Sequence, residues 1–155
     1  MGTTRRHIRI DRSADNVWNV VSDHGAIADW FPAVESSSAT GSGRACPLAD
    51  GTELEEEIAT NDTDLRRLQY RITKGMPVDF HLATVDVLED GDGALVIYSS
   101  GVEPHEVADA IGPPSSPAST ASRPASSSRP IGRLKLFGGS RRGLRRSRRR
   151  TAPGR

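Results

Sequence analysis

The feature that most constrains the fold is a regular succession of short alternating segments and turn signals between residues 33 and 100. Alternation of apolar and polar residues predicts half-buried strands, and the Gly- and Asp-rich stretches between them predict tight turns. We expect strands over residues 33–40, near 44–48, and over 53–60, 66–73, 79–88 and 94–100. Turn signals at this spacing are typical of an antiparallel meander.

Two short helices are expected before this meander. Residues 5–13 alternate and predict a first strand, after which Ser13 has the chemistry of a helix N-cap. The apolar residues of the helix that follows are Val17, Trp18, Val20 and Val21. Residues 23–32 predict a second short helix that ends at Pro32, because a residue before proline is disfavoured in the helical region. Strands with segregated helices indicate an α+β fold.

A third helix begins after the last expected strand and is cut short. Pro104 and Glu106 suit its first turn, and residues 107–111 continue it, but Gly112-Pro113-Pro114 ends it. A curved antiparallel sheet has one face to bury, and two short helices cannot cover that face alone. The sequence therefore predicts a truncated C-terminal helix. We expect a domain that is marginally stable, prone to aggregation, or dependent on a homo-oligomer or another partner that covers the exposed sheet.

The charge of the chain is divided between two segments. Residues 1–112 hold 9 basic and all 20 acidic residues, a net charge of −11, whereas residues 113–155 hold 12 basic residues and no acidic one. The second segment is rich in Ser, Pro and Gly and has few large apolar residues, so burial cannot offset its ordering entropy. We interpret residues 1–112 as a folded domain and residues 113–155 as a disordered basic tail.

Three stretches of the sequence together resemble a known superfamily. They read VWNVVSDHGAIADWFPAVESS (17–37), GSGRACPLADGTELEEEIATND (41–62) and YRITKGMPVDFHLATVDV (70–87). Residues 5–111 resemble the START-like, birch-allergen-like superfamily, and within it the SRPBCC branch of polyketide cyclases/dehydrases and lipid-transport proteins. The resemblance implies a helix-grip fold, in which a seven-stranded antiparallel sheet wraps around a long C-terminal helix. It also implies a cavity for an apolar or amphipathic small molecule, bordered by the turns at residues 49–52 and 74–78.

The C-terminal segment departs from the pattern of this superfamily. Its members need a long helix, which this chain abandons at Gly112. Residues 131–139 (IGRLKLFGG) nevertheless resemble the end of that helix in relatives, so family-like sequence brackets a Pro-, Ser- and Arg-rich stretch. Translation of GC-rich DNA in a shifted frame tends to produce such residues. We hypothesise a frameshift near codon 112.

Glu56 is the first candidate for a functional residue. Leu54, Glu56 and Ile58 share one face of their expected strand by alternation, which places the carboxyl group among apolar neighbours. Burial raises the pKa of a carboxyl group and suits it to acid–base catalysis. The alternative interpretation is that Glu56 pairs with Arg44 or faces solvent as an ordinary strand residue.

Aromatic residues and one histidine complete the set of candidates. His81 would orient a ligand hydroxyl or transfer a proton, or else be an ordinary strand histidine. Tyr70 and Tyr98 combine an apolar ring with a polar tip, which suits both a ligand site and a sheet. Trp30 is expected in the core or, as the resemblance favours, with Phe31 at the rim of the cavity. The candidate ligand-binding residues are Trp30, Phe31, Arg44, Glu56, Tyr70, His81 and Tyr98, with Glu56 and His81 as catalytic candidates.

Other functional classes find little support in the sequence. The single cysteine excludes an intramolecular disulfide, and the four histidines form no recognisable ligand set, so we expect neither a metal nor a cofactor. No apolar run approaches the roughly 18 residues of a membrane span or suggests a secretory signal, and we expect a cytoplasmic protein. The Arg-rich run at residues 140–150 has no aromatic residue to stack on bases, so nucleic-acid binding is the weakest hypothesis.

The sequence as a whole favours binding or transport of a small hydrophobic or amphipathic ligand, lipid- or polyketide-like, between the sheet and the C-terminal helix. The alternative is a polyketide cyclase/dehydratase-type enzyme that uses polar residues of the cavity. The sequence shows no recognisable catalytic constellation, so binding is the leading hypothesis and catalysis stays open.

Overall fold

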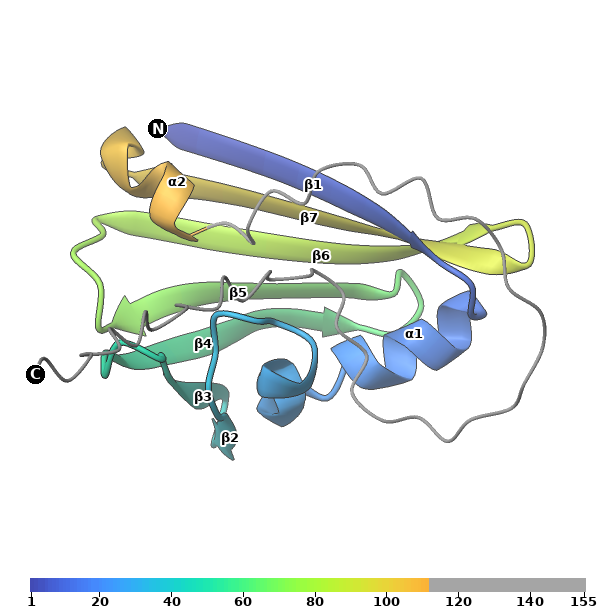
Figure 1. Cartoon of the computed structure of the whole chain (residues 1–155), viewed down its shortest axis with the longest axis horizontal. Coiled ribbons are helices and arrows are strands. Elements are labelled where there is room, and N and C mark those ends of the chain that lie inside the picture. The colour runs from blue at the N-terminus through green and yellow to red at the C-terminus, as the bar shows by residue number, and fades with distance from the viewer. Residues whose placement is uncertain (112–155) are drawn as a thin grey trace, which may run out of the picture.

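Seven antiparallel strands form one sheet in the order β1-β7-β6-β5-β4-β3-β2 (Figure 1). The computed structural model describes residues 1–111. Its strands are β1 (Gly2–Ile10), β2 (Ser38–Thr40), β3 (Gly43–Pro47), β4 (Glu53–Asp62), β5 (Arg67–Lys74), β6 (Phe80–Asp90) and β7 (Gly93–Glu103). Strands β2 to β6 each pair with the next strand along the chain, and β1 pairs with β7. The predicted antiparallel meander and its α+β class are confirmed.

The first helix, α1 (Ala14–Val21), begins where its cap predicts. The Ser13 side chain accepts a hydrogen bond from the backbone N–H of Asn16 at 3.3 Å, which satisfies one of the free donors of the first turn. Val17, Trp18 and Val21 are buried against the sheet. This apolar stripe at helical spacing fixes which side of α1 faces the core.

The segment after α1 is a 3-10 helix, η1 (His24–Asp29), which lies within the helix predicted over residues 23–32 and ends earlier than the predicted stop at Pro32. The strand expected over residues 33–40 is shorter than predicted, because only Ser38–Thr40 form β2. The Ser37 hydroxyl explains the difference, since it donates to the Gly25 carbonyl at 2.6 Å and accepts from the Ala28 N–H at 3.2 Å. These bonds hold the segment against η1, so before β2 it forms only an isolated bridge, between Val34 and Leu48.

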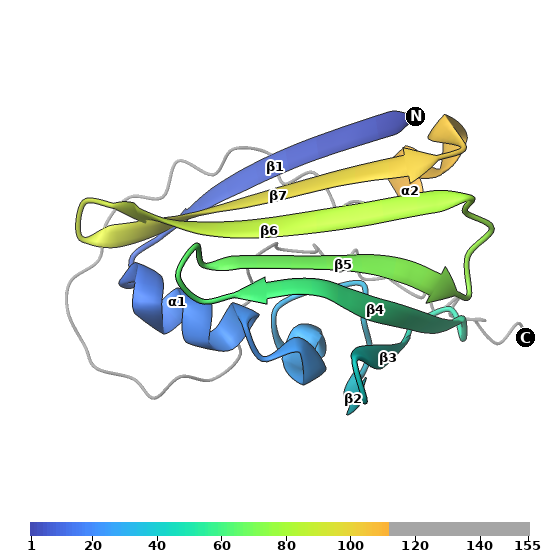
Figure 2. The ribbon, with the colours of Figure 1, turned by 180° about the vertical axis from the view of Figure 1, so that it is seen from behind.

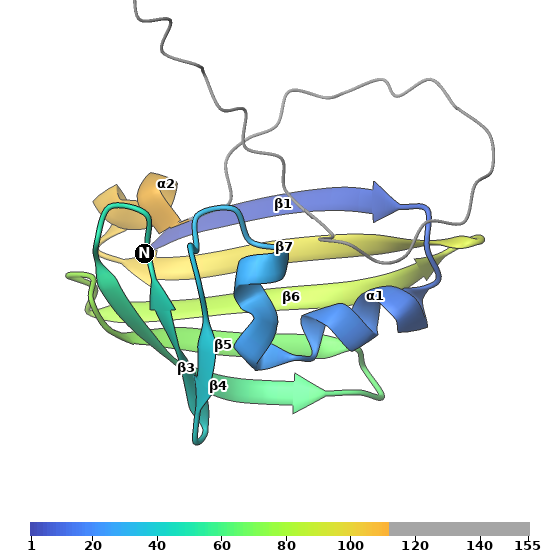
Figure 3. The same ribbon diagram turned by 60° about the horizontal axis from the view of Figure 1, so that its bottom comes forward.

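The two faces of the sheet differ in what covers them. Every second side chain along β6 and β7 is buried, Val85 and Val96 among them, and these residues pack with α1 and η1 in one core. Figure 3 shows both helices on this inner face. Figure 2 shows the opposite, outer face, across which no helix of the described residues lies.

Strand β4 is irregular where it passes the core. Its pairing with β5 shifts register between Glu55 and Glu56 and again between Ile58 and Thr60, and such bulges bend a strand. Gly43 of β3 lies against this part of β4, where an added Cβ would stand 2.2 Å from the backbone oxygen of Glu56. The close approach of the two strands brings Arg44 opposite Glu56.

The C-terminal helix starts at the predicted place. Pro104 precedes a short 3-10 helix, η2 (His105–Val107), and α2 (Ala108–Ile111) follows it beside the N-terminal end of β1 (Figure 1). The predicted helix end at Gly112, the basic tail at 113–155 and the hypothetical frameshift lie outside the described residues. No helix in the described part of the chain is long and apolar enough to cross a membrane.

Candidate functional site

A small cavity lies under the inner face, between the sheet, the segment after α1 and the end of α2. Its volume is about 50 Å³, room for a few water molecules and well below the roughly 300–1,000 Å³ of common ligand pockets. Most of its wall is apolar, comprising Ile27, Phe31, Ala33, Val34, Leu48, Leu54, Ile72, Met76 and Ile111. Four polar side chains complete the wall: Glu56, Tyr70, His81 and Tyr98.

Glu56 forms a buried ion pair with Arg44, which stands behind the wall. The Arg44 Nε lies 2.6 Å from the Glu56 Oε2, and the two side chains are 0% and 5% exposed. Arg44 also donates through Nη1 to the His24 carbonyl at 3.2 Å, and its Cζ lies 4.3 Å from the centroid of the Tyr70 ring. Burial raises the pKa of Glu56 above its ordinary value, and the Arg44 guanidinium opposes that rise. The charge of the pair is thus balanced within the core.

Cys46 makes a second contact with the same carboxylate oxygen. Its Sγ donates to the Glu56 Oε2 at 3.7 Å, and the side chain is fully buried. Burial, reinforced by the Glu56 charge, raises the pKa of Cys46 to about 12. The thiol therefore stays protonated at neutral pH, and Glu56 Oε2 is occupied by two protein donors.

His81 is held in one tautomer by a backbone group. The N–H of Ile72 donates to the His81 Nδ1 at 3.1 Å, so the hydrogen of the neutral ring is carried on Nε2. Nε2 is itself buried and has no hydrogen-bond partner in the described residues. Burial lowers the pKa of His81 to about 4, which keeps the ring neutral at pH 7. The cavity wall therefore holds an unpaired N–H donor.

Aromatic rings line the cavity together with this histidine. The Tyr70 ring lies 6.1 Å from the His81 ring, and the Phe31 ring lies 6.1 Å from that of Tyr98, measured between centroids. Burial raises the pKa of Tyr98 to about 12 and raises that of Tyr70 well above its ordinary value. Both phenols stay protonated at neutral pH, so these rings give the site an uncharged, largely apolar surface.

The structure brings five of the predicted site residues together in the wall: Phe31, Glu56, Tyr70, His81 and Tyr98. The other two are buried but are not among the lining residues. Arg44 holds Glu56 from behind, and Trp30 packs edge-on against Phe31 with 6.0 Å between ring centroids. Both support the wall, and neither lines it.

Sequence reasoning missed several residues of the site: Met76 and Ile111 in the wall, and Cys46, which contacts Glu56 but does not line the cavity. Met76 comes from the segment 74–78 that the resemblance places at the cavity mouth, although the residue itself was not singled out. Ile111 is the last described residue of α2, and Cys46 was considered only for disulfide and zinc chemistry. The alternation of β3 gives the one available signal for Cys46, since it shares a strand face with Arg44.

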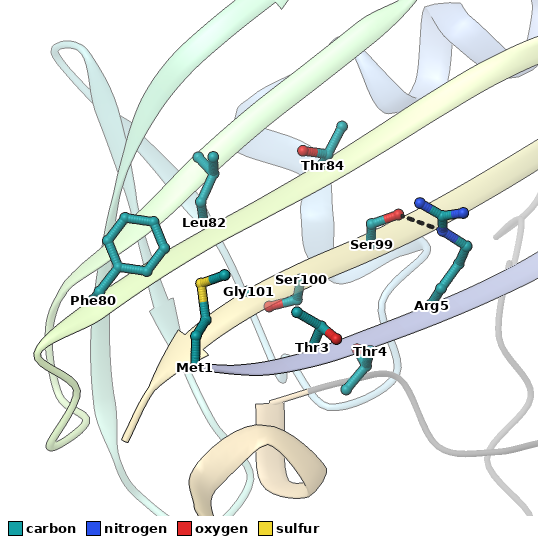
Figure 4. Close-up of a pocket in the computed structure, with 10 residues that line it drawn as sticks. All are labelled: Met1, Thr3, Thr4, Arg5, Phe80, Leu82, Thr84, Ser99, Ser100 and Gly101. Atoms are coloured by element: carbon teal, nitrogen blue, oxygen red, sulfur yellow. Dashed lines mark hydrogen bonds between the residues drawn. The ribbon is translucent and has the colours of Figure 1, made fainter. Parts of the chain in front are cut away.

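A second hollow lies on the outer face over β1, β7 and β6 (Figure 4). It is open and has a volume of about 680 Å³. Met1, Phe80 and Leu82 border one end of this outer hollow, and Arg5, Thr84 and Ser99 border the other. Thr4 and Ser100 also border the hollow, but alternation turns their buried hydroxyls toward the inner face. The polar side chains that face the hollow are those of Thr3, Arg5, Thr84 and Ser99, none of which is buried. We therefore place the candidate site in the inner cavity.

The described residues contain no group of three or more His, Cys, Asp or Glu side chains that could hold a metal ion. Arg66 and Arg67, whose side chains would repel a cation, pair with the carboxylates around them, Asp15, Asp86 and Glu89. The acidic surface of residues 1–111 is thus partly neutralised by the chain's own arginines.

Comparison of the sequence with protein families gives one match, which spans residues 1–148. The matching family is described as polyketide cyclase / dehydrase and lipid transport. The chain belongs to this family. The match covers the predicted range of residues 5–111 and runs beyond it.

Solved structures agree with membership of the polyketide cyclase/dehydrase and lipid transport family. The protein XoxI from Bacillus cereus is 29% identical, with a TM-score of 0.65, over 71% of this chain and 81% of that one. A START superfamily protein from Mycobacterium smegmatis is 14% identical, with a TM-score of 0.58, over 66% and 77% of the two chains. Norcoclaurine synthase from Thalictrum flavum is 22% identical, with a TM-score of 0.55, over 68% and 72%.

The last two likenesses show the fold alone, which is the helix-grip fold of START-like and birch-allergen-like proteins. The predicted resemblance and fold are thus confirmed for this member of the polyketide cyclase/dehydrase and lipid transport family. No curated protein matches the chain. The family description is consistent with binding of a hydrophobic ligand and leaves its identity open.

Proposed function

We propose that the chain binds a small hydrophobic or amphipathic ligand, lipid- or polyketide-like, in the inner cavity. The observation that carries this proposal is an apolar wall with a few convergent polar groups, one of which is the unpaired N–H of His81. Small-molecule sites are typically apolar clefts with a small number of placed polar groups. The family description, which includes lipid transport, supports the same function.

Binding of such a ligand requires the cavity to widen. Its volume of about 50 Å³ is smaller than a molecule of this class. Met76, between β5 and β6, and Ile111, in the last described turn of α2, form part of the wall. An unbranched methionine adapts readily to a new neighbour. We propose that these two side chains move when the ligand enters.

Catalysis of the cyclase/dehydratase type is the alternative, with Glu56 or His81 as the acid or base. The contacts favour binding over this alternative. Glu56 Oε2 accepts bonds from Arg44 and Cys46, and His81 Nδ1 accepts one from Ile72. A histidine with a pKa of about 4 is also a weak base at neutral pH. The likeness to norcoclaurine synthase concerns the fold and brings no activity to this chain.

Native mass spectrometry of the full chain, purified from its own source, tests the proposed function. We expect an added mass of a few hundred daltons that is lost on denaturation. A titration with 1-decanol, followed by tryptophan fluorescence in a Trp18→Phe variant, gives a second test, because Trp30 then reports alone on Phe31 and the cavity. Absence of both the added mass and a saturable fluorescence change would contradict the proposal. Conversion of the released molecule into a new product by fresh protein would favour the enzyme.

Four further expectations from the sequence remain to be tested. We propose that the protein acts in the cytoplasm, which fractionation of source cells would test. A covering partner or homo-oligomer stays a prediction. Nucleic-acid association through residues 140–150, which lie outside the described residues, stays the weakest hypothesis. Resequencing of the DNA around codon 112 tests the frameshift, and an undisturbed frame would contradict it.

A further inference from the structure

The wall of the inner cavity contains a donor that the protein itself leaves unpaired. His81 is 3% exposed, and its Nε2 is among the buried polar atoms without a hydrogen-bond partner in the described residues. Leaving a buried donor unpaired costs free energy, so native proteins pair nearly all such groups with protein, water or ligand. The Nε2–H therefore marks the point in the cavity where an acceptor atom is needed.

The position of the hydrogen is set by a backbone contact. Because the Ile72 N–H donates to Nδ1, that nitrogen must present its lone pair, and the neutral ring carries its hydrogen on Nε2. Nε2 is also the ring nitrogen farther from the β6 backbone, and His81 is one of the residues that line the cavity. His81 is thus oriented as a fixed hydrogen-bond donor.

The surroundings of this donor discriminate between acceptors. Tyr70, Tyr98, Phe31 and Ile72 give the cavity an uncharged surface. The charged group in the wall is Glu56, which would repel an anion, and its Arg44 partner is not among the lining residues. A carboxylate would also lose its hydration on entry without a cation to replace it. An uncharged acceptor avoids both costs.

We propose that the cavity selects apolar ligands that bear an uncharged carbonyl group, and that the carbonyl oxygen accepts a hydrogen bond from Nε2–H of His81. This inference rests on the proposed function and names the ligand class for the same site. A cavity of about 50 Å³ next to His81 has room for the carbonyl group of such a molecule. The remainder of the ligand occupies the space that opens when Met76 and Ile111 move.

Three probes of nearly equal shape separate the possible acceptors. Acetophenone carries an uncharged carbonyl, isopropenylbenzene replaces the oxygen by a methylene group, and benzoate carries a negative charge. Each is titrated into the full chain at pH 7, and binding is followed by NMR chemical shifts. Comparison across the three removes the contribution of the phenyl ring, which all of them share.

A substitution of the histidine isolates the hydrogen bond. His81→Phe removes the donor and keeps a ring, and we expect it to weaken acetophenone binding about tenfold while isopropenylbenzene binding changes less than twofold. His7→Phe is the matched control, because His7 lies on the exposed side of β1, and it is expected to leave both affinities unchanged. A second readout needs no substitution: in wild-type protein the ¹H and ¹⁵N resonances of His81 Nε2–H shift downfield with acetophenone and not with isopropenylbenzene.

The outcomes distinguish this inference from the proposed function. Equal losses for ketone and hydrocarbon in His81→Phe, together with an unshifted Nε2–H resonance, would overturn the carbonyl inference and leave the binding function intact. Tighter binding of benzoate than of acetophenone would overturn the preference for an uncharged group. Failure of all three probes to bind wild-type protein at millimolar concentration would contradict the proposed function itself.

Discussion

The Nε of Arg44 and the Oε2 of Glu56 lie 2.6 Å apart, and both side chains are almost completely withdrawn from solvent. This pair joins β3 to β4 directly behind the cavity, and the Tyr70 ring lies against the guanidinium. A buried pair of this kind is costly to break, because the remaining partner becomes an uncompensated buried charge. The wall of the cavity therefore depends on a contact between one lining residue, Glu56, and one residue behind the wall, Arg44.

Glu56→Leu is expected to destabilise the protein by about 3–5 kcal/mol, since it leaves the Arg44 charge unpaired in the core. Urea unfolding followed by circular dichroism measures the change. The double variant Arg44→Met/Glu56→Leu is expected to recover most of the loss, because neither charge then remains.

Glu57 provides the matched control for this prediction. It is the next residue of β4, and its carboxylate pairs with Arg71 at 2.7 Å, but its side chain is 40% exposed. Glu57→Leu is therefore expected to change the free energy of unfolding by less than about 1 kcal/mol. Equal effects of Glu56→Leu and Glu57→Leu would contradict the role assigned to the buried pair.

The pH dependence of stability provides a test of His81. Burial lowers its pKa from the ordinary 6.5 to about 4, so between these values the folded protein binds fewer protons than the unfolded chain. The contribution of His81 to the free energy of unfolding is thus fully present above pH 6.5 and is lost as the pH falls toward 4. We expect a loss of about 2 kcal/mol between pH 7.5 and 5 from this group.

His81→Gln removes the group that titrates, and it is expected to remove this part of the pH dependence. Urea unfolding at pH 7.5 and pH 5, with wild type and variant compared at each pH, isolates the contribution of His81 from that of the carboxylates. An unchanged difference between the two pH values in His81→Gln would show that the ring is not buried in its neutral form.

Gly43 is required by the close approach of β3 to β4. An added Cβ would lie 2.2 Å from the Glu56 backbone oxygen, and the two strands could remove this steric clash only by moving apart. Gly43→Ala is expected to cost roughly 1–3 kcal/mol in thermal or urea unfolding. Gly101→Ala, also in a strand, is the control, since its Cβ would find its nearest neighbour at 3.5 Å, and it is expected to cost well under 1 kcal/mol.

The single cysteine reports on the integrity of the same strands. Cys46 is fully buried and its pKa is raised to about 12, so it should react with a thiol reagent such as Ellman's reagent at least roughly a hundredfold more slowly in buffer than in urea. Absorbance at a single wavelength follows the reaction. Gly43→Ala is expected to speed labelling in buffer, and rapid labelling of the wild-type protein would contradict the packing of β3 on β4.

Local patterns in the sequence predict much of this fold. Ser13 begins α1 because its side chain is a good N-cap, and alternation along residues 53–60 turns Leu54 and Glu56 to the inner face. These predictions depend on neighbours in the sequence and need no tertiary information.

The details of the site depend on contacts between distant segments, which alternation does not specify. The pairing of Arg44 with Glu56 was one of two open alternatives, because it depends on the register of β3 and on the bulge in β4. The donor state of His81 depends on the backbone of Ile72 in the neighbouring strand. The shortening of β2 follows from the Ser37 hydroxyl, which turns to η1.

The central claim is that a ligand enters under the inner face of the sheet and leaves the larger outer hollow empty. The most direct test is a ¹H–¹⁵N NMR titration of the full chain with acetophenone, with the shifts assigned along β5, β6 and β7. Saturable shifts at Tyr70, His81 and Tyr98, with Leu82, Thr84 and Ser99 unaffected, are the predicted result. Shifts confined to Leu82, Thr84 and Ser99 would place the ligand on the outer face and contradict the account.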